Sequence, residues 1–401
     1  MVSMINNGRI ASEAVQAVSA DLTYAFYDHP RYEPPKAYEE ARETFLERIA
    51  DVPGVVSVYE SGTGGISRPG ISDIDLIVVV EDEVDDPAAL REGIEAAKTD
   101  EYYFFHGPEV LTRSAFPEYY NVLPMPKDLQ HHYGESLDYQ KNQDRFNYLV
   151  YLVDSVMTTY PMEFLELLLF PGPSVDHHRL NIVLSDAFDL LVPGPIAEQF
   201  AVDLDTRFAV HRMNSLRNDM MLFSEITERE TPTLDAFDAS ITDLRERWFE
   251  LDRPDRETLL VERLQDAVTA CFAFVEHLNA HLADIGVQVP ATELTVRSHE
   301  TRHNEFRPDW SASTAERKTC EYYREGRVRT VVLPQSVTVN KRLRGNEPVT
   351  APKAYRTALD NRDRSKRQRD AAMAAYKYHP LRAWYMRVMG TLFGLKTRLV
   401  R

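Results

Sequence analysis

Cysteine is almost missing from this chain, which has two, Cys271 and Cys320, among 401 residues. They lie far apart and form no Cys-x-x-Cys pair, which excludes a disulfide framework and a cysteine-based structural zinc site. Also missing is any apolar run of the roughly 18 residues that a membrane-spanning helix needs. The first residues, MVSMINNGRIASEAVQ, lack the charged and apolar regions of a secretory signal. We therefore expect a protein of the reducing cytoplasm without a transmembrane segment.

Lysine is scarce as well. The chain has 10 lysines against 36 arginines, and its 63 acidic residues outnumber its 46 basic ones, which gives a net charge of −17. Such an acidic surface repels itself, and concentrated salt screens that repulsion. An acid-rich, lysine-poor composition is typical of proteins from salt-loving microbes, and we expect a halophilic archaeon as the source.

The charge is unevenly distributed along the chain. Residues 351–401 contain 13 basic and three acidic residues, a net charge of +10, so the first 350 residues carry −27. This asymmetry predicts that 351–401 is a separate basic tail that binds an anionic partner or docks onto the acidic body. Its last part, 376–401, mixes aromatic, aliphatic and basic residues. That mixture is typical of an amphipathic helix on an anionic membrane surface, which would make the protein peripheral on the inner face of the membrane. A helix docked on the body and a nucleic-acid contact remain alternatives.

The first third of the chain alternates helical and strand patterns. Apolar residues at helical spacing between Pro35 and a Pro-Gly stop predict a helix, and VVSVYESG, 55–62, predicts a strand. A second strand follows at 74–80, then a helix over 85–100 and a strand within YYFFHGPEVLTRSAF, 102–116. We expect an α/β (α+β) domain with a mixed sheet over residues 1–124.

Beyond residue 124 the pattern changes to apolar residues at spacings of three and four. This predicts a mainly helical domain over 125–290, a possible site for the acceptor. A mixed segment, 291–350, includes GRVRTVVLPQSVTVNKRL, which predicts a short β-hairpin broken at Leu333-Pro334. The basic tail, 351–401, follows.

The stretch SGTGGISRPGISDIDLIVVVEDE, 61–83, places two acids directly before the most apolar run of the chain. The run Leu76–Val80 predicts a strand that is buried on both faces. Asp73 and Asp75 lie two positions apart, so on an extended chain their carboxylates share a face. Two such carboxylates repel each other unless a cation lies between them, and hard oxygen ligands favour magnesium. The glycines upstream, with Thr63, predict a loop whose backbone amides approach a phosphate chain.

In these features the sequence resembles the DNA polymerase β-like nucleotidyltransferase superfamily, in particular its minimal, aminoglycoside-type domain. The matching pieces are a helix before Pro53, the pair Gly62-Thr63, a spacer, and SDIDLIVVV, 72–80. A third acid in that family lies on a following strand, and PEVLTRSAF supplies Glu109. Two departures are Gly-Thr in place of the family's usual Gly-Ser, and Glu in place of the commoner Asp. The resemblance covers roughly residues 36–120.

The resemblance implies a nucleotidyltransferase-type fold and a function. The enzyme would move a nucleoside monophosphate from a nucleoside triphosphate, with ATP expected, to a hydroxyl of an unidentified acceptor, and pyrophosphate would leave. Asp73, Asp75 and Glu109 would be the catalytic acids and would bind two Mg²⁺ ions. Residues that would bind the nucleotide are Ser61, Gly62, Thr63 and Ser72. The alternative is a non-catalytic protein of the same fold that binds a membrane surface or RNA through its tail.

Histidine motifs favour no second activity. HETRH, 299–303, matches the zinc-protease pattern HExxH, but no apolar helix surrounds it, and we interpret the match as accidental. The adjacent pairs His131/His132 and His177/His178 do not suit a shared metal, and we expect them in loops.

Overall fold

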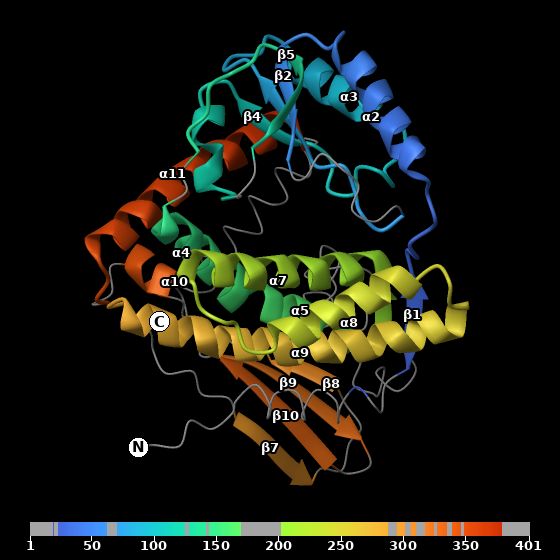
Figure 1. Ribbon diagram of the computed structural model, residues 1–401, viewed down its shortest axis with the longest axis vertical. Helices are drawn as coiled ribbons and strands as arrows, with labels where there is room; N and C mark the ends of the chain where they lie inside the picture. Colours follow the sequence, from blue (N-terminus) through green and yellow to red (C-terminus); the bar gives the residue numbers. More distant parts are fainter. Residues whose placement is uncertain are drawn as a thin grey trace, which may run out of the picture. The chain divides into compact units, whose positions relative to one another are not determined.

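The computed structural model describes residues 19, 23–61, 70–124, 128–141, 144–169, 202–287, 295–300, 306–309, 317–324, 327–334, 339–345 and 349–378 (Figure 1). The chain divides into two compact units. An α/β unit combines Arg31–Tyr151 with Lys353–Arg401, and a helical unit combines Met1–Pro30 with Leu152–Pro352.

The α/β unit is built on a four-stranded sheet. Its strands are β2 (Val55–Glu60), β3 (Leu76–Val80), β4 (Glu109–Thr112) and β5 (Gln130–Gly134). Its helices are α2 (Pro35–Ile49), α3 (Pro87–Ala97), the 3₁₀ helix η1 (Phe116–Asn121), the start of α4 (Arg145–Asp154), and α11 (Lys353–Tyr376). The strand order is β4-β3-β2-β5, with β3 parallel to β4 and the other neighbours antiparallel. The expected mixed sheet is therefore present.

Strand β3 lies inside the sheet, and all five of its residues are buried. Side chains on one face of the sheet pack against α2 and α3, with Val78 and Val80 among them. On the other face, Ile77 and Val79 pack against aromatic side chains of η1. An uninterrupted aliphatic run is what such two-sided burial requires.

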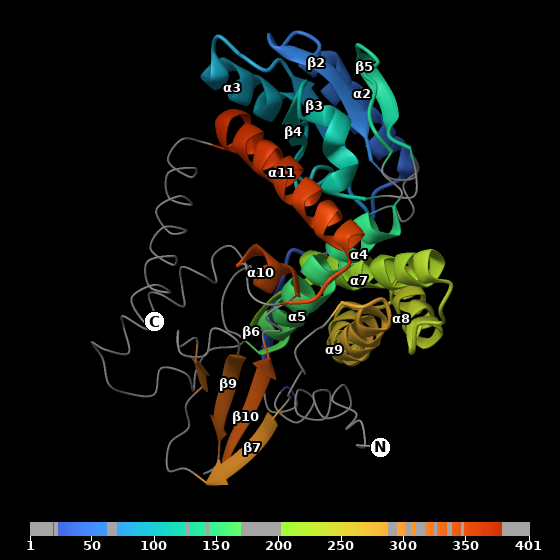
Figure 2. The same ribbon diagram turned by 90° about the vertical axis from the view of Figure 1, so that its left-hand side faces the viewer.

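Helix α11 is part of the α/β unit, although Leu152–Pro352 of the helical unit lies between it and β4 along the chain. It contacts β4, η1 and α3, and Figure 2 shows it lying beside β4. The amide of Val110 in β4 donates to Met373 Sδ at 3.1 Å, so the helix covers an edge strand of the sheet. Arg362, which is 6% exposed, donates to the backbone carbonyls of Asn121 and Val122.

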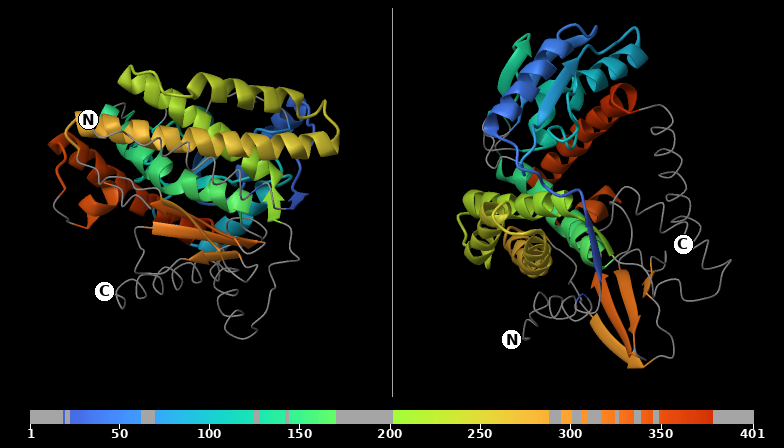
Figure 3. Two further views of the ribbon diagram at one scale, coloured as in Figure 1. Left: turned by 90° about the horizontal axis from the view of Figure 1, so that it is seen from below. Right: turned by 90° about the vertical axis from the view of Figure 1, so that its right-hand side faces the viewer.

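The helical unit contains most of the long helices. Its helical elements are the π-helical turn η2 (Ser155–Thr159), α5 (Tyr160–Leu169), α7 (Thr206–Thr227), α8 (Leu234–Arg247), α9 (Arg253–Asp284) and α10 (Val339–Arg344). Helices α7, α8 and α9 pack against one another (Figure 3). A short parallel pair joins β1 (Tyr24–Tyr27) to β6 (Val202–Asp205).

A second sheet of four antiparallel strands belongs to the same unit. It is formed by β7 (Thr295–Glu300), β8 (Phe306–Asp309), β9 (Arg317–Arg324) and β10 (Arg327–Pro334), in the order β7-β10-β9-β8. The hairpin expected within GRVRTVVLPQSVTVNKRL is wrong: 327–334 form the single strand β10, which pairs with the preceding strand β9, and Val339–Arg344 form helix α10. Strand order could not be read from the sequence, because it depends on pairing between distant segments.

The structure divides the chain differently from the boundaries 1–124, 125–290, 291–350 and 351–401. Residues 128–151 supply β5 and the start of α4 to the α/β unit, and 353–378 supply α11. The part of the basic tail that forms α11 is therefore not separate from the body. It packs against the α/β unit, which is the docking alternative. Of the last part, 376–401, Tyr376 is the final residue of α11, and residues from 379 on lie outside the described residues. The strand expected within 102–116 is limited to Glu109–Thr112, because 101–106 form turns.

Within the part of the chain that the structure describes, no helix combines the length and the apolar character that crossing a membrane demands.

Candidate functional site

The three acids singled out in the sequence lie at the same end of the α/β sheet. Asp73 and Asp75 precede β3, and Glu109 is the first residue of β4. Because β3 and β4 are parallel and Glu109 pairs with Ile77, the Glu109 side chain lies on the face of the sheet that Ile77 occupies. Asp75 precedes Ile77 by two residues on an extended chain and therefore shares that face.

Electrostatics show that these acids are close to one another. The pKa of the Asp75 carboxyl is raised well above its usual value, first because surrounding protein atoms reduce its hydration, and then by the charges of Asp73, Glu109 and Glu60. The Asp75 side chain nevertheless has exposed surface. The charged form of Asp75 is therefore destabilised, and a ligand from solvent can still reach the side chain.

Two oxygens of the group are buried without a hydrogen-bond partner, Asp73 Oδ2 and Glu109 Oε2. A buried carboxylate oxygen that accepts no hydrogen bond is costly, and in native proteins such an atom is commonly found where a ligand or ion binds. These two atoms mark the place where an additional positive charge would stabilise the site.

The other oxygen of Glu109, Oε1, has a partner. Arg369 of α11 donates from Nη1 to Glu109 Oε1 at 3.3 Å, with 24% of the arginine side chain and 30% of the glutamate side chain exposed. Tyr119 is also near these acids: burial raises the pKa of its phenol, and the charges of Glu109 and Asp75 raise it further. Burial alone would lower the pKa of Arg369, but Glu109 and Asp370 outweigh burial and raise it. Sequence reasoning missed Arg369, because it lies at the opposite end of the chain from Glu109 and no local pattern links the two.

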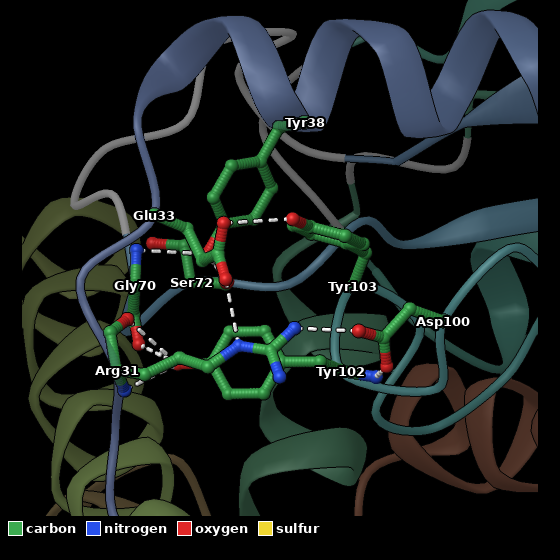
Figure 4. Close-up of polar contacts among 8 residues, drawn as sticks. All are labelled: Arg31, Glu33, Tyr38, Gly70, Ser72, Asp100, Tyr102 and Tyr103. Atoms are coloured by element: carbon green, nitrogen blue, oxygen red, sulfur yellow. Dashed lines mark hydrogen bonds and ion pairs between the residues drawn. The ribbon is translucent and has the colours of Figure 1, made fainter.

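The segment that leads into Asp73 is held by a network of tyrosines (Figure 4). Tyr38 of α2 is fully buried, and its hydroxyl accepts from Gly70 N at 2.8 Å and donates to the Ser72 carbonyl at 2.9 Å. Tyr102 donates to the Gly70 carbonyl. Gly70 has φ +82°, a conformation that glycine adopts without strain. One residue past Asp73, the amide of Ile74 donates to the Tyr103 carbonyl at 2.8 Å.

An ion-paired arginine fixes the tyrosines in turn. The guanidinium of Arg31 pairs with Glu33 and Asp100 and stacks over the Tyr102 ring at 4.2 Å. Glu33 also accepts from the Tyr103 hydroxyl at 2.8 Å. In Figure 4, Tyr38 approaches the backbone of Gly70 and Ser72 from α2, and the other side chains come from the segment before α2 and the segment before β4. The network therefore positions the backbone on either side of Asp73.

The expected nucleotide-binding residues are only partly described. The amide of Ser61 donates to the Asp75 carbonyl at 2.9 Å, which extends the pairing of β2 with β3 toward the acids. Ser72 contributes its carbonyl to Tyr38 and is half-buried. Gly62 and Thr63 lie outside the described residues.

A second polar cluster lies at the end of β2. Glu60 is 8% exposed, and its Oε2 contacts His132 Nε2 at 2.9 Å and Arg42 Nη1 at 3.1 Å. Burial alone would raise the pKa of Glu60, but the hydrogen bond from His132 and the contact with Arg42 outweigh it and lower it. The expectation that His131 and His132 lie in loops is wrong, because both belong to β5. They are in a strand because β5 completes the sheet beside β2, a pairing between segments that are distant in the sequence.

The donor chemistry of the acids suits a hard divalent cation. Within the described ranges, no group of three or more His, Cys, Asp and Glu side chains is arranged to hold a metal ion as it stands. The pair Asp73 and Asp75 suits a metal ion. One cation there would reduce the repulsion between the two carboxylates and would also give the buried Asp73 Oδ2 a partner.

The HETRH segment does not form a zinc-protease helix. His299 and Glu300 belong to strand β7, where they pair with Val328 and Arg327 of β10. Residues 301–303 lie outside the described residues, as do His177 and His178.

Comparison with known proteins identifies no relative: no protein-family model, no curated protein and no solved structure matches the chain.

Proposed function

We propose that the α/β unit is a metal-dependent nucleotidyltransferase domain. The observation that carries the proposal is the convergence of Asp73, Asp75 and Glu109 at one end of the sheet, in an electrostatic environment that favours an added cation. The order of helix, strand, glycine-containing loop, strand with Asp-x-Asp, and following strand with a third acid supports it, because the nucleotidyltransferase-type fold has that order.

Asp73 and Asp75 would hold a magnesium ion, which when bound neutralises charge on the triphosphate of a nucleotide. ATP is the nucleotide that we expect. The acceptor is a hydroxyl compound that is not identified. Its oxygen would form a bond to the α-phosphorus, the bond from that phosphorus to the bridging oxygen would break, and the electron pair would leave with pyrophosphate.

Glu109 would take up the proton of the acceptor hydroxyl. Its Oε2 is free of hydrogen bonds, whereas Oε1 is held by Arg369. A carboxylate that is fixed through one oxygen presents the other in a constant direction, which suits a general base. The network around Tyr38 would keep Asp73 at a constant position relative to Glu109.

The test is a calorimetric titration of each nucleoside triphosphate into the full chain in concentrated potassium chloride, with and without magnesium. We expect binding that depends on magnesium and that is lost in Asp73→Asn/Asp75→Asn. The matched control is Asp51→Asn/Asp85→Asn, which removes two exposed aspartates from the same unit and should bind as the natural chain does. Equal binding by the site variant and the natural chain would refute the proposal.

A non-catalytic protein of this fold is the second candidate. The observation in its favour is the arginine already paired with Glu109, because an inactive relative needs to neutralise its acids without a metal. This alternative predicts that the folded protein binds none of the nucleoside triphosphates. The search for a ligand would then turn to the basic segment 376–401 and to an anionic membrane surface or RNA as its partner.

A further inference from the structure

Arg369 is the one basic side chain that forms an ion pair with any of the three acids in the described part of the chain. Asp73 and Asp75 form no ion pair there, and the charge of Asp73 adds to the repulsion at Asp75. When all three carboxylates are ionised, which is the state that binds a metal, they carry −3 and Arg369 carries +1, so these four side chains sum to −2, not counting Asp370, which also pairs with Arg369. One divalent cation would bring this charge to zero, whereas two would leave the group with a net positive charge.

The position of Arg369 is fixed by the helix that carries it. Met373, one turn further along α11, accepts from Val110 N, the residue after Glu109. Asp370 accepts from Arg369 Nη2 at 2.9 Å and from Nε at 3.2 Å. Further along, the Tyr376 hydroxyl donates to the Asp82 carbonyl, and Lys377 Nζ donates to the His106 carbonyl at 2.7 Å. The contacts of Met373, Tyr376 and Lys377 fix α11 beside β4, and the Asp370 carboxylate restrains the guanidinium next to Glu109.

A second metal ion at Glu109 would meet this guanidinium. The oxygen of Glu109 open to such an ion is Oε2, because Oε1 is already paired with Arg369 Nη1 at 3.3 Å. An ion at Oε2 would therefore share one carboxylate with the guanidinium. The like charges of an ion and a guanidinium a few ångströms apart repel each other in partly buried surroundings. The arginine and a second metal are thus alternatives at the same carboxylate.

We propose that Arg369 replaces the second metal ion of this site, so that the α/β unit binds one divalent cation, at Asp73 and Asp75, in place of the two that the family resemblance implies. The inference rests on the proposed function, because it assumes that the acids bind a metal. Arg369 acts as a positioning residue: it orients Glu109 and supplies positive charge to it.

The experiment counts bound manganese by electron paramagnetic resonance of the free ion, with the full chain in concentrated potassium chloride. We expect one ion per chain for the natural protein and for Arg369→Lys, which keeps the charge. Two ions are expected for Arg369→Gln, because Glu109 is then free to take part in a second site. The control Arg364→Gln removes an arginine–carboxylate pair of the same helix, with Glu118, and should still bind one.

A merely structural role for Arg369 would leave the count at one in folded Arg369→Gln and would overturn the inference. Two ions in the natural chain would also overturn it while leaving the proposed function intact, and this count keeps the test decisive if Arg369→Gln does not fold. No ion in the natural chain, or ions that persist in Asp73→Asn/Asp75→Asn, would overturn the proposed function and this inference together.

Discussion

The hydroxyl of Tyr38 offers a direct test of how the segment before Asp73 is held. The substitution Tyr38→Phe keeps the buried ring and removes one oxygen, so it creates no large cavity. That oxygen satisfies two backbone groups, Gly70 N and the Ser72 carbonyl, at 2.8 and 2.9 Å. Gly70 is buried, and water cannot replace the lost partner without local opening.

The magnitude follows from these two bonds. A hydrogen bond contributes about 1 kcal/mol net, and a buried group left without a partner costs about 1–3 kcal/mol. We therefore expect Tyr38→Phe to destabilise the α/β unit by about 2–3 kcal/mol, which corresponds to a roughly 30- to 150-fold larger opening constant. The same loosening should weaken binding of manganese to Asp73.

The assay is hydrogen exchange of the β3 amides, Ile77–Val80, under conditions in which exchange reports the opening equilibrium. Exchange is preferable to a single melting curve, because a chain of two units need not unfold in one step. The control Tyr133→Phe removes a hydroxyl that donates to the Ala50 carbonyl at 3.2 Å on the exposed surface, and it should have a small effect. If Tyr38→Phe and Tyr133→Phe accelerate exchange equally, the tyrosine network does not hold the site.

Two further predictions concern buried charges. The pKa of Asp205, the N-cap of α7, is raised to about 6 by burial, so the folded state holds a proton that the unfolded state has lost, and stability falls as pH rises from about 4 to about 6. The variant Asp205→Asn keeps the cap of α7, so its stability should not fall between about pH 4 and about pH 6, and urea unfolding at pH 7 should show it to be more stable than the natural chain. The control Asp252→Asn, at the exposed cap of α9, should not be stabilised. An equal stabilisation by the two substitutions would contradict the reasoning. Arg362→Met leaves the carbonyls beneath α11 without a donor and should cost about 2–4 kcal/mol, measured as faster amide exchange in β4. Arg364→Met breaks a half-exposed ion pair and should cost at most about 1 kcal/mol; comparable losses would show that the burial of Arg362 is unimportant.

Much of the α/β unit could be predicted because its signals are local. A proline-led helix with apolar residues at helical spacing gives α2, and an uninterrupted aliphatic run gives β3. The shared face of Asp73 and Asp75 follows from the sequence for the same reason, because residues two positions apart on an extended chain point to the same side. That Glu109 joins these two acids is a prediction from the family resemblance. The register of β4 on β3, which pairs Glu109 with Ile77, places Glu109 on the same face.

What the sequence alone determined is therefore the type of each strongly patterned element and the pairing of two acids at the start of a buried strand. Only the tertiary structure decided that α11 belongs beside β4 and that Arg369 pairs with Glu109. A run of basic residues looks the same in sequence whether it remains in solvent or folds onto carboxylates and carbonyls. The difference depends on which surface lies opposite, and that surface is made by strands and turns from the first third of the chain.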